Sequence, residues 1–106
     1  MSNKTITKQL YKAFLQLKTE AEVEAFCTDL MTPQEIETFA GRWAVAQELD
    51  KGTPQRKVSS LTGVSIATVT RVNRFLNRGA QGYRLVLDRV KNSLHHSPAT
   101  RLAKAS

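Results

Sequence analysis

The side chains best suited to bind anions are concentrated between residues 55 and 78. Arg56 and Lys57 are adjacent, and three more arginines follow at intervals of three and four residues. These are Arg71, Arg74 and Arg78. Guanidinium and ammonium groups bind phosphate oxygens, and arginine also pairs with the acceptor edge of guanine. The segment therefore predicts contact with a polyanion.

Charge is divided unevenly along the chain, whose net charge is +7. Residues 1–50 contain five Lys or Arg and eight Asp or Glu, a net charge of −3. Residues 51–106 contain eleven Lys or Arg and the single acid Asp88, a net charge of +10. Such asymmetry is typical of proteins that bind nucleic acid, with an anionic membrane surface as the second candidate.

Patterns that support catalysis or metal binding do not emerge from the sequence. It contains no evident Ser/His/Asp set, metal-ligand cluster or phosphate-cradling loop, so no enzyme is predicted. His95 and His96 are adjacent and would point different ways on a helix, with no Cys, Asp or Glu near them, which predicts no metal site. Cys27 lies among apolar residues at helical spacing and is expected to be a small core residue.

Apolar residues recur at intervals of three and four, without strand-like alternation, which predicts an all-α fold. Helices are expected at about 4–18, 19–31, 33–51, 54–62, 65–77 and 82–95. We expect one domain over residues 1–95 and a flexible tail over 96–106. No apolar run approaches the ~20 residues that span a bilayer, and the N-terminus lacks a signal-peptide pattern. A cytoplasmic protein without a membrane partner is predicted.

Residues 54–77 have the pattern of a helix-turn-helix. Gly63 supplies the positive φ that the tight turn needs, and Ser65 is placed to cap the second helix. The apolar residues expected to pack this unit are Val58, Leu61, Val64, Val69 and Val72.

A helix-turn-helix places the N-terminal part of its second helix in the major groove of duplex DNA. Threonine hydroxyls hydrogen-bond base edges, Ala and Ile contact thymine methyl groups, and the flanking cations neutralise phosphates. The residues expected from this geometry to contact DNA are Arg56, Lys57, Ser65, Ile66, Ala67, Thr68, Thr70, Arg71 and Arg74. Structured RNA is a weaker alternative, because the aromatic residues fall mostly at core spacings rather than at exposed stacking positions.

Four motifs occur in a set order along the chain, namely Leu30-Met31-Thr32-Pro33, Arg42, Gln55-Arg56 and Ile66-Ala67-Thr68-Val69-Thr70-Arg71. In this order they resemble the Trp repressor superfamily. Residues 70–77 and 82–89 are similar to its YerC/YecD branch of Trp-repressor-related DNA-binding regulators. The resemblance covers roughly residues 5–95 and is firmest over about 30–90.

The resemblance implies an intertwined homodimer of six-helix subunits that reads palindromic operators as a transcriptional regulator, expected to be a repressor. It adds Gln55 and Ser59 to the residues expected to face DNA. Independently, a helical chain of 106 residues encloses a modest core and would gain burial from a partner chain. The alternative function is a protein-interaction adaptor that keeps this fold without binding operator DNA.

The resemblance also bears on an effector, because L-tryptophan is the corepressor of the classical repressor. Thr32, Arg42 and Arg71 match positions that line its pocket, and the two arginines could hold a carboxylate or stack on an indole. Val72 replaces a glycine, and Phe75 replaces the serine that meets the ligand's amino group. These residues fill the cavity and remove a polar partner, so we expect no cofactor and predict that L-tryptophan is not the corepressor. A further hypothesis is that Phe75 itself takes the place of the ligand.

Overall fold

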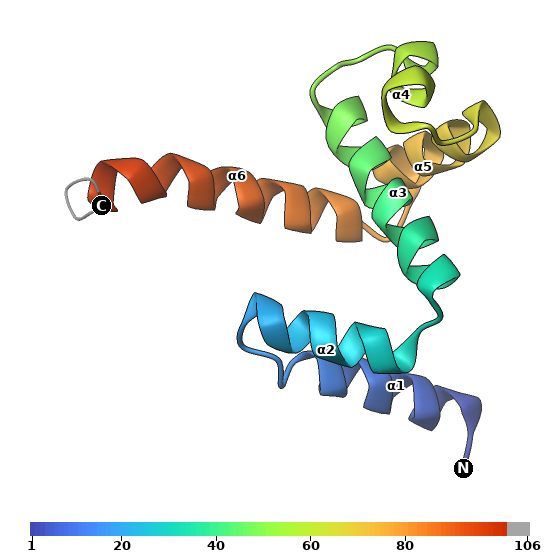
Figure 1. Cartoon of the computed structure of the whole chain (residues 1–106), viewed down its shortest axis with the longest axis vertical. Coiled ribbons are helices and arrows are strands. Elements are labelled where there is room, and N and C mark those ends of the chain that lie inside the picture. The colour runs from blue at the N-terminus through green and yellow to red at the C-terminus, as the bar shows by residue number, and fades with distance from the viewer. Residues whose placement is uncertain (102–106) are drawn as a thin grey trace. The chain divides into compact units, whose positions relative to one another are not determined.

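In the computed structural model the backbone is described for residues 1–101 and the side chains for residues 1–93. This part of the chain contains helices and no strand (Figure 1). Its six helices are α1 (Asn3–Phe14), α2 (Glu20–Leu30), α3 (Pro33–Asp50), α4 (Gln55–Thr62), α5 (Ile66–Arg78) and α6 (Gly82–Arg101). The predicted all-α fold of about six helices is confirmed. The chain divides into an N-terminal unit, residues 1–38, and a C-terminal unit, residues 39–106.

The N-terminal unit pairs α1 with α2. Phe14 and Phe26 meet edge to face, with ring centroids 5.2 Å apart. α2 begins at a side-chain cap, because Thr19 Oγ1 accepts a hydrogen bond from the Glu22 N–H at 3.1 Å. The Glu22 carboxylate in turn accepts from the Lys18 N–H at 2.9 Å. These reciprocal bonds fix the start of the helix and the entry of the chain.

Neither α1 nor α2 contains a buried residue. Ile6, Val23 and Leu30 keep 51, 41 and 45% of their surface exposed. Two short helices offer too little apolar surface to enclose each other's stripes. α1 also ends at Phe14, four residues before the expected end, because the chain tightens there before the cap of α2.

α3 begins and ends at signals that are readable in the sequence. Thr32 Oγ1 accepts from the Glu35 N–H at 3.1 Å, and Glu35 Oε1 accepts from the Thr32 N–H at 2.9 Å. This is a complete capping box, with Pro33 at the first helical position. Gly52 follows the end of the helix with φ of +91°.

The core of the C-terminal unit lies where α3, α4 and α5 meet (Figure 1). Its members are Val45, Ala46, Val58, Val69 and Val72, each at most 1% exposed. Trp43 and Tyr83 pack on this cluster with their rings stacked, at a centroid separation of 6.4 Å and an interplanar angle of 15°. The core therefore holds the inner sides of α4 and α5 against α3.

Leu61 is 60% exposed, so the prediction that it packs α4 is wrong. α4 is only eight residues long, and Val58 is the residue that it buries. Val64, which follows the turn, packs on the core where Leu61 does not. A Cβ on Gly41 of α3 would lie 3.2 Å from Val64 Cγ2, so α3 passes close to this turn.

Two ion pairs connect the end of α3 to α6. Asp50 Oδ1 lies 2.7 Å from Arg84 Nη1, and Asp50 Oδ2 lies 2.7 Å from Lys91 Nζ. The hydrogen bonds from Lys91 and Arg84 lower the pKa of the Asp50 carboxyl below its ordinary value, against the opposing effect of burial. α6 is thereby held at two points about two turns apart.

α6 continues to Arg101, beyond the expected end at residue 95. The predicted flexible tail over 96–106 therefore begins within this helix, and residues 102–106 lie outside the described part. Among the residues that the structure describes, no helix is both long and apolar enough to cross a membrane.

Candidate nucleic-acid interface

A tight turn joins α4 to α5. Gly63 has φ of +75°, a conformation that glycine adopts without the steric cost of a side chain. The Ser59 hydroxyl donates to the Val64 carbonyl at 2.7 Å, and the Thr62 hydroxyl accepts from the Val64 N–H at 3.2 Å. The predicted glycine turn is confirmed, and hydrogen bonds as well as packing fix the angle between the two helices.

The N-terminus of α5 faces solvent. Ser65 precedes the helix in an extended conformation, and its Oγ accepts from the Thr68 N–H at 3.2 Å. The first N–H groups of the helix, those of Ile66 and Ala67, have no partner within the helix and carry the positive end of its dipole. Ser65, Ile66 and Ala67 are all exposed. This terminus is suited to an anion or to the acceptor edge of a base.

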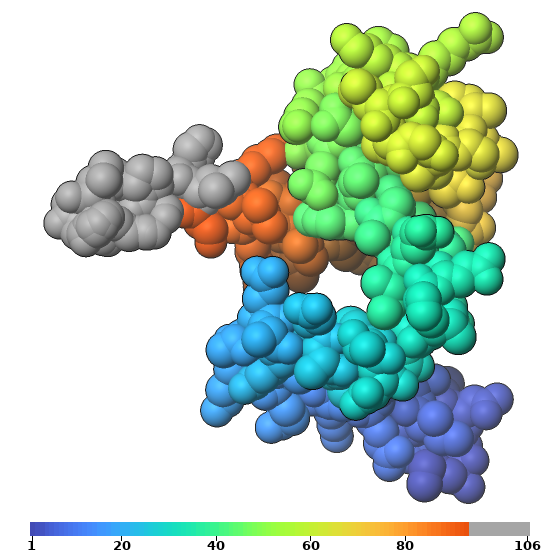
Figure 2. Space-filling model, viewed as in Figure 1, coloured from blue at the N-terminus to red at the C-terminus, as the bar shows by residue number. Residues whose placement is uncertain are grey.

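The residues expected to contact DNA differ in exposure. Eight are exposed: Arg56, Lys57, Ser65, Ile66, Ala67, Thr70, Arg71 and Arg74. Three are half-buried: Gln55, Ser59 and Thr68. Figure 2 shows α4 and the first turns of α5, coloured yellow-green to yellow, at the surface of the C-terminal unit. The structure thus brings all eleven together on α4, the turn and α5.

Gln55 and Thr70 join the two helices through a side-chain hydrogen bond. The Thr70 hydroxyl donates to Gln55 Oε1 at 3.1 Å. This bond occupies the carbonyl of Gln55, so its amide N–H groups are the donors that remain for a ligand. Sequence patterns could not reveal the pairing, because the two residues are fifteen positions apart and on different helices.

Two arginines of α5 rest on an aromatic ring. The guanidinium carbons of Arg71 and Arg74 lie 5.0 and 5.3 Å from the centroid of the Phe75 ring, within the range of cation–π attraction. None of the ion pairs among the described residues involves either arginine. The positive charge is therefore held in place without being neutralised. The spacing of four residues places Arg71 and Phe75 on the same face of α5, and this spacing is the sequence signal for the contact.

A cavity of about 240 Å³ lies among α3, α5 and α6. Its lining residues are Arg42, Arg71, Val72, Phe75 and Tyr83. Two of the three predicted effector-pocket residues, Arg42 and Arg71, therefore share one cavity. The Arg42 guanidinium stacks over the Phe39 ring at 5.5 Å, and its buried Nε has no hydrogen-bond partner within the described part of the chain. The third, Thr32, lies in the N-terminal unit, where it caps α3.

A wider, mainly apolar groove shares Phe75 and Tyr83 with this cavity. The groove has a volume of about 520 Å³ and is lined by Trp43, Phe75, Ala80, Gly82, Tyr83 and Val86. Phe75 and Val86 remain 41 and 46% exposed. Such a surface accepts apolar side chains.

Metal binding has no evident site in the described part of the chain. No group of three or more His, Cys, Asp or Glu side chains is placed there to hold an ion. The side chains of His95 and His96, for which the sequence predicts no metal site, lie outside the described residues.

Known proteins resemble this chain along most of its length. Residues 6–96 match the sequence model of the family described as Trp repressor protein. The uncharacterized protein YerC of Bacillus subtilis (strain 168) is 42% identical over 85 residues, which cover 80% of this chain and 82% of YerC. A Trp operon repressor homolog of Vibrio campbellii (strain ATCC BAA-1116) is 47% identical over 49 residues, covering 45% of this chain and 49% of that protein.

The resemblance extends to three dimensions. The crystal structure of a TrpR-like protein from Eubacterium eligens ATCC 27750 matches with a TM-score of 0.79 and 36% identity, over 85% of this chain and 96% of that chain. The family expected from the motifs is therefore confirmed by sequence and by fold. This chain belongs to the Trp repressor family, a family of DNA-binding regulators.

Proposed function

We propose that this chain is a sequence-specific transcriptional repressor that binds operator DNA as a homodimer through α4 and α5. The observation that carries the proposal is the exposed N-terminus of α5, held in a fixed orientation by the buried Val69 and Val72. Membership of the Trp repressor family supports the same function.

The exposed side chains have the chemistry for two kinds of contact. Ile66 and Ala67 suit the methyl groups of thymine, and the amide of Gln55, oriented by Thr70, donates to acceptors. Arg71 and Arg74 suit phosphates, because Phe75 holds their charges near the surface. Repulsion of DNA is weak here, since no Asp or Glu occurs between Asp50 and Asp88.

The proposed dimerisation is supported by apolar surface that a single chain leaves uncovered. α1 and α2 bury no residue, and Leu85, Val86 and Val90 of α6 are each 43 to 49% exposed. A partner chain that covers these residues would supply the burial that each chain lacks. Two helix-turn-helix units, one from each chain and related by a twofold axis, then favour a palindromic operator.

We further propose that L-tryptophan is not the corepressor. The cavity with Arg42 and Arg71 measures about 240 Å³, below the roughly 300 to 1,000 Å³ of ordinary ligand pockets. Phe75 lines it and already stacks on Arg71, while Val72 is buried beside it. Phe75 thus makes the arginine contact that an indole would make. Isothermal titration should give no heat of binding, and low-micromolar binding of L-tryptophan would overturn this proposal.

The proposed function is tested by selecting binding sites from a random duplex library with the purified chain. We expect a palindromic consensus, bound by two chains with an affinity that falls steeply with salt. Arg71→Gln and Arg74→Gln should each reduce the slope of log affinity against log salt by about one unit. Lys51→Gln is a matched control, because Lys51 is exposed but paired with Glu48 at 3.0 Å, outside α4 and α5.

The alternative function, a protein-interaction adaptor, gives a different outcome in the same experiment. No duplex would be enriched, and a protein partner captured by the chain would stay bound after Arg56→Ala or Arg71→Ala. An affinity for duplex that is equal for all sequences would instead contradict operator recognition while leaving DNA binding in place.

A further inference from the structure

α1 presents a face of lysines that the helix-turn-helix does not use. Lys4, Lys8 and Lys12 recur every four residues, so they lie one above another on α1. All three are exposed, and none takes part in an ion pair within the described part of the chain. No Asp or Glu occurs before Glu20. α1 therefore carries no acid of its own, and no ion pair in the described part of the chain joins its lysines to the acids of α2.

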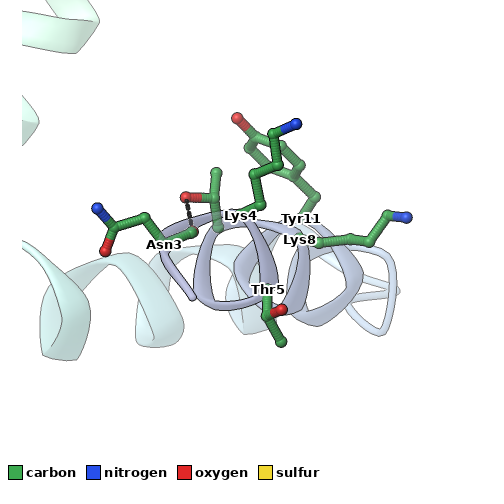
Figure 3. Close-up of a pocket in the computed structure, with 6 residues that line it drawn as sticks. Asn3, Lys4, Thr5, Lys8 and Tyr11 are labelled. Atoms are coloured by element: carbon green, nitrogen blue, oxygen red, sulfur yellow. Dashed lines mark hydrogen bonds between the residues drawn. The ribbon is translucent and has the colours of Figure 1, made fainter. Parts of the chain in front are cut away.

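On α1 itself the residues next to these lysines are polar rather than acidic, and the acids of the N-terminal unit lie on α2 and at the start of α3. Figure 3 shows Lys4 and Tyr11 rising from the same side of α1, with Thr5 on the opposite side. An open hollow of about 500 Å³ along α1 is lined by atoms of Asn3, Lys4, Thr5, Thr7, Lys8 and Tyr11. Tyr11 is 64% exposed, so its hydroxyl is available as a further donor. We call Lys4, Lys8, Tyr11 and Lys12 the lysine face.

This arrangement works against the isolated helix. Like charges four residues apart repel, and a cation in the first turn opposes the positive end of the helix dipole. Lys4 incurs both effects, and no acidic residue occupies the first turn to offset them. A bound polyanion would reverse the sign of each effect.

We propose that the lysine face is a second DNA-binding surface, which contacts backbone phosphates without reading sequence. The inference rests on the proposed function of α4 and α5. The rise from Lys4 to Lys12 along α1 is about 12 Å. Over that length of the duplex axis, one strand carries roughly three to four phosphates. Lysine acts as a point charge without the bidentate geometry that reads guanine, which fits a contact with phosphates alone.

Duplex DNA fits the lysine face better than a lipid surface does. Membrane-bound amphipathic helices insert an apolar face opposite their cations. In α1 that side packs on α2 at its C-terminal end, where Phe14 meets Phe26 edge to face, and the proposed dimer partner covers the exposed remainder, such as Ile6. The strongly basic C-terminal half of the same chain also points to nucleic acid as the shared partner.

The test compares two triple variants of the full chain by fluorescence anisotropy, on the selected operator with long flanks and on a random duplex of equal length. Lys4, Lys8 and Lys12 are replaced together by Gln, which removes charge with little change in helix propensity, or by Arg, which keeps it. In the Gln variant the slope of log affinity against log salt should fall by about 0.9 for each phosphate contact removed. Its affinity should fall by the same factor on both duplexes. The Arg variant should bind like the wild type, and circular dichroism should show equal helix content in all three.

Each other outcome is decisive. An unchanged salt slope in the Gln variant, with operator selectivity intact, would overturn the lysine face alone. Lysine-dependent binding to phosphatidylserine vesicles without a change on duplex would overturn it in favour of a lipid surface. If Arg71→Gln and Arg74→Gln leave duplex binding unaffected while the Gln triple abolishes it, the proposed role of α5 fails and the lysine face stands. A wild-type chain that binds no duplex at all would overturn both.

Discussion

At the scale of single residues, the backbone conformation of Gly63 leads to a prediction about the free energy of unfolding. Its φ of +75° places it where an L residue is strained by roughly 1 to 2 kcal/mol. No neighbouring atom would touch an added Cβ, so Gly63→Ala should lower the free energy of unfolding by that strain alone. Urea denaturation followed by circular dichroism measures the change.

Gly82→Ala is the matched control for this prediction. Gly82 opens α6, also has open space around its missing Cβ, and does not lie in the left-handed region. The same substitution should there be neutral or slightly stabilising, because alanine restricts the unfolded chain and favours helix. Equal effects at the two positions would contradict the argument from φ.

Residue types predicted local geometry better than they predicted burial. Gly63 and Ser65 act as expected, because turn and cap chemistry depends on a few adjacent atoms. The exposure of Leu61 was not predictable, since it depends on which residue fills the corner after a two-turn helix. The bond between Gln55 and Thr70 was equally hidden, because it exists only once α4 and α5 have docked.

At the scale of elements, the side-chain cap of α5 should contribute to the stability of the fold and fix the start of the helix proposed to contact DNA. Ser65→Ala removes the acceptor for the Thr68 N–H and should cost about 1 kcal/mol of stability. Ser60→Ala, an exposed position inside α4, is the control and should change stability little or raise it slightly. Thermal unfolding of both variants measures the difference, and a smaller loss at Ser65 than at Ser60 would contradict the cap.

The attachment of α6 to α3 should depend on pH through Asp50. Lys91 and Arg84 hold the pKa of its carboxyl below the ordinary value of 3.8, so the unfolded chain takes up this proton before the folded one. The ion pairs therefore stabilise the fold fully above about pH 4, and the contribution is lost as pH falls through the lowered pKa. Urea unfolding at about pH 6 and about pH 3 should show this loss.

Asp50→Asn should be less stable than the wild type near neutral pH and should lose part of the acid dependence. Asp88→Asn is the control, because Asp88 is 56% exposed and 3.8 Å from Arg84. Its substitution should leave the acid dependence close to that of the wild type. A wild-type chain equally stable at both pH values would show that the Asp50 pairs do not hold α6.

The sequence predicted the ends of helices correctly where a side-chain cap fixes them. Its predictions were wrong where no cap does so. The capping box at Thr32 and Glu35 marked the start of α3 correctly. α1 stopped at Phe14 although its apolar pattern continues to Leu17, because the chain must turn to reach the cap at Thr19. α6 runs past residue 95 to Arg101, although Pro98 has no backbone N–H to donate within the helix.

At the scale of the whole molecule, the uncovered apolar residues predict the oligomeric state. Val86 lines the apolar groove of the C-terminal unit and is 46% exposed, whereas the 60% exposed Leu61 belongs to α4, on the proposed DNA-binding surface. In a homodimer that covers α6, a buried carboxylate without a partner strongly opposes association. Val86→Glu should therefore shift the chain from dimer toward monomer in sedimentation equilibrium, with lower thermal stability.

Leu61→Glu makes the same chemical change on a surface that the dimer should leave open. We expect it to sediment as the wild-type dimer and to lose affinity for duplex, because it adds an acid to the surface that faces phosphates. Val86→Glu should lose affinity for duplex as well, because a monomer carries one helix-turn-helix unit instead of two. Its binding should therefore recover at high protein concentration, where the dimer forms again. A Val86→Glu chain that sediments like the wild type would place the dimer contact away from the groove.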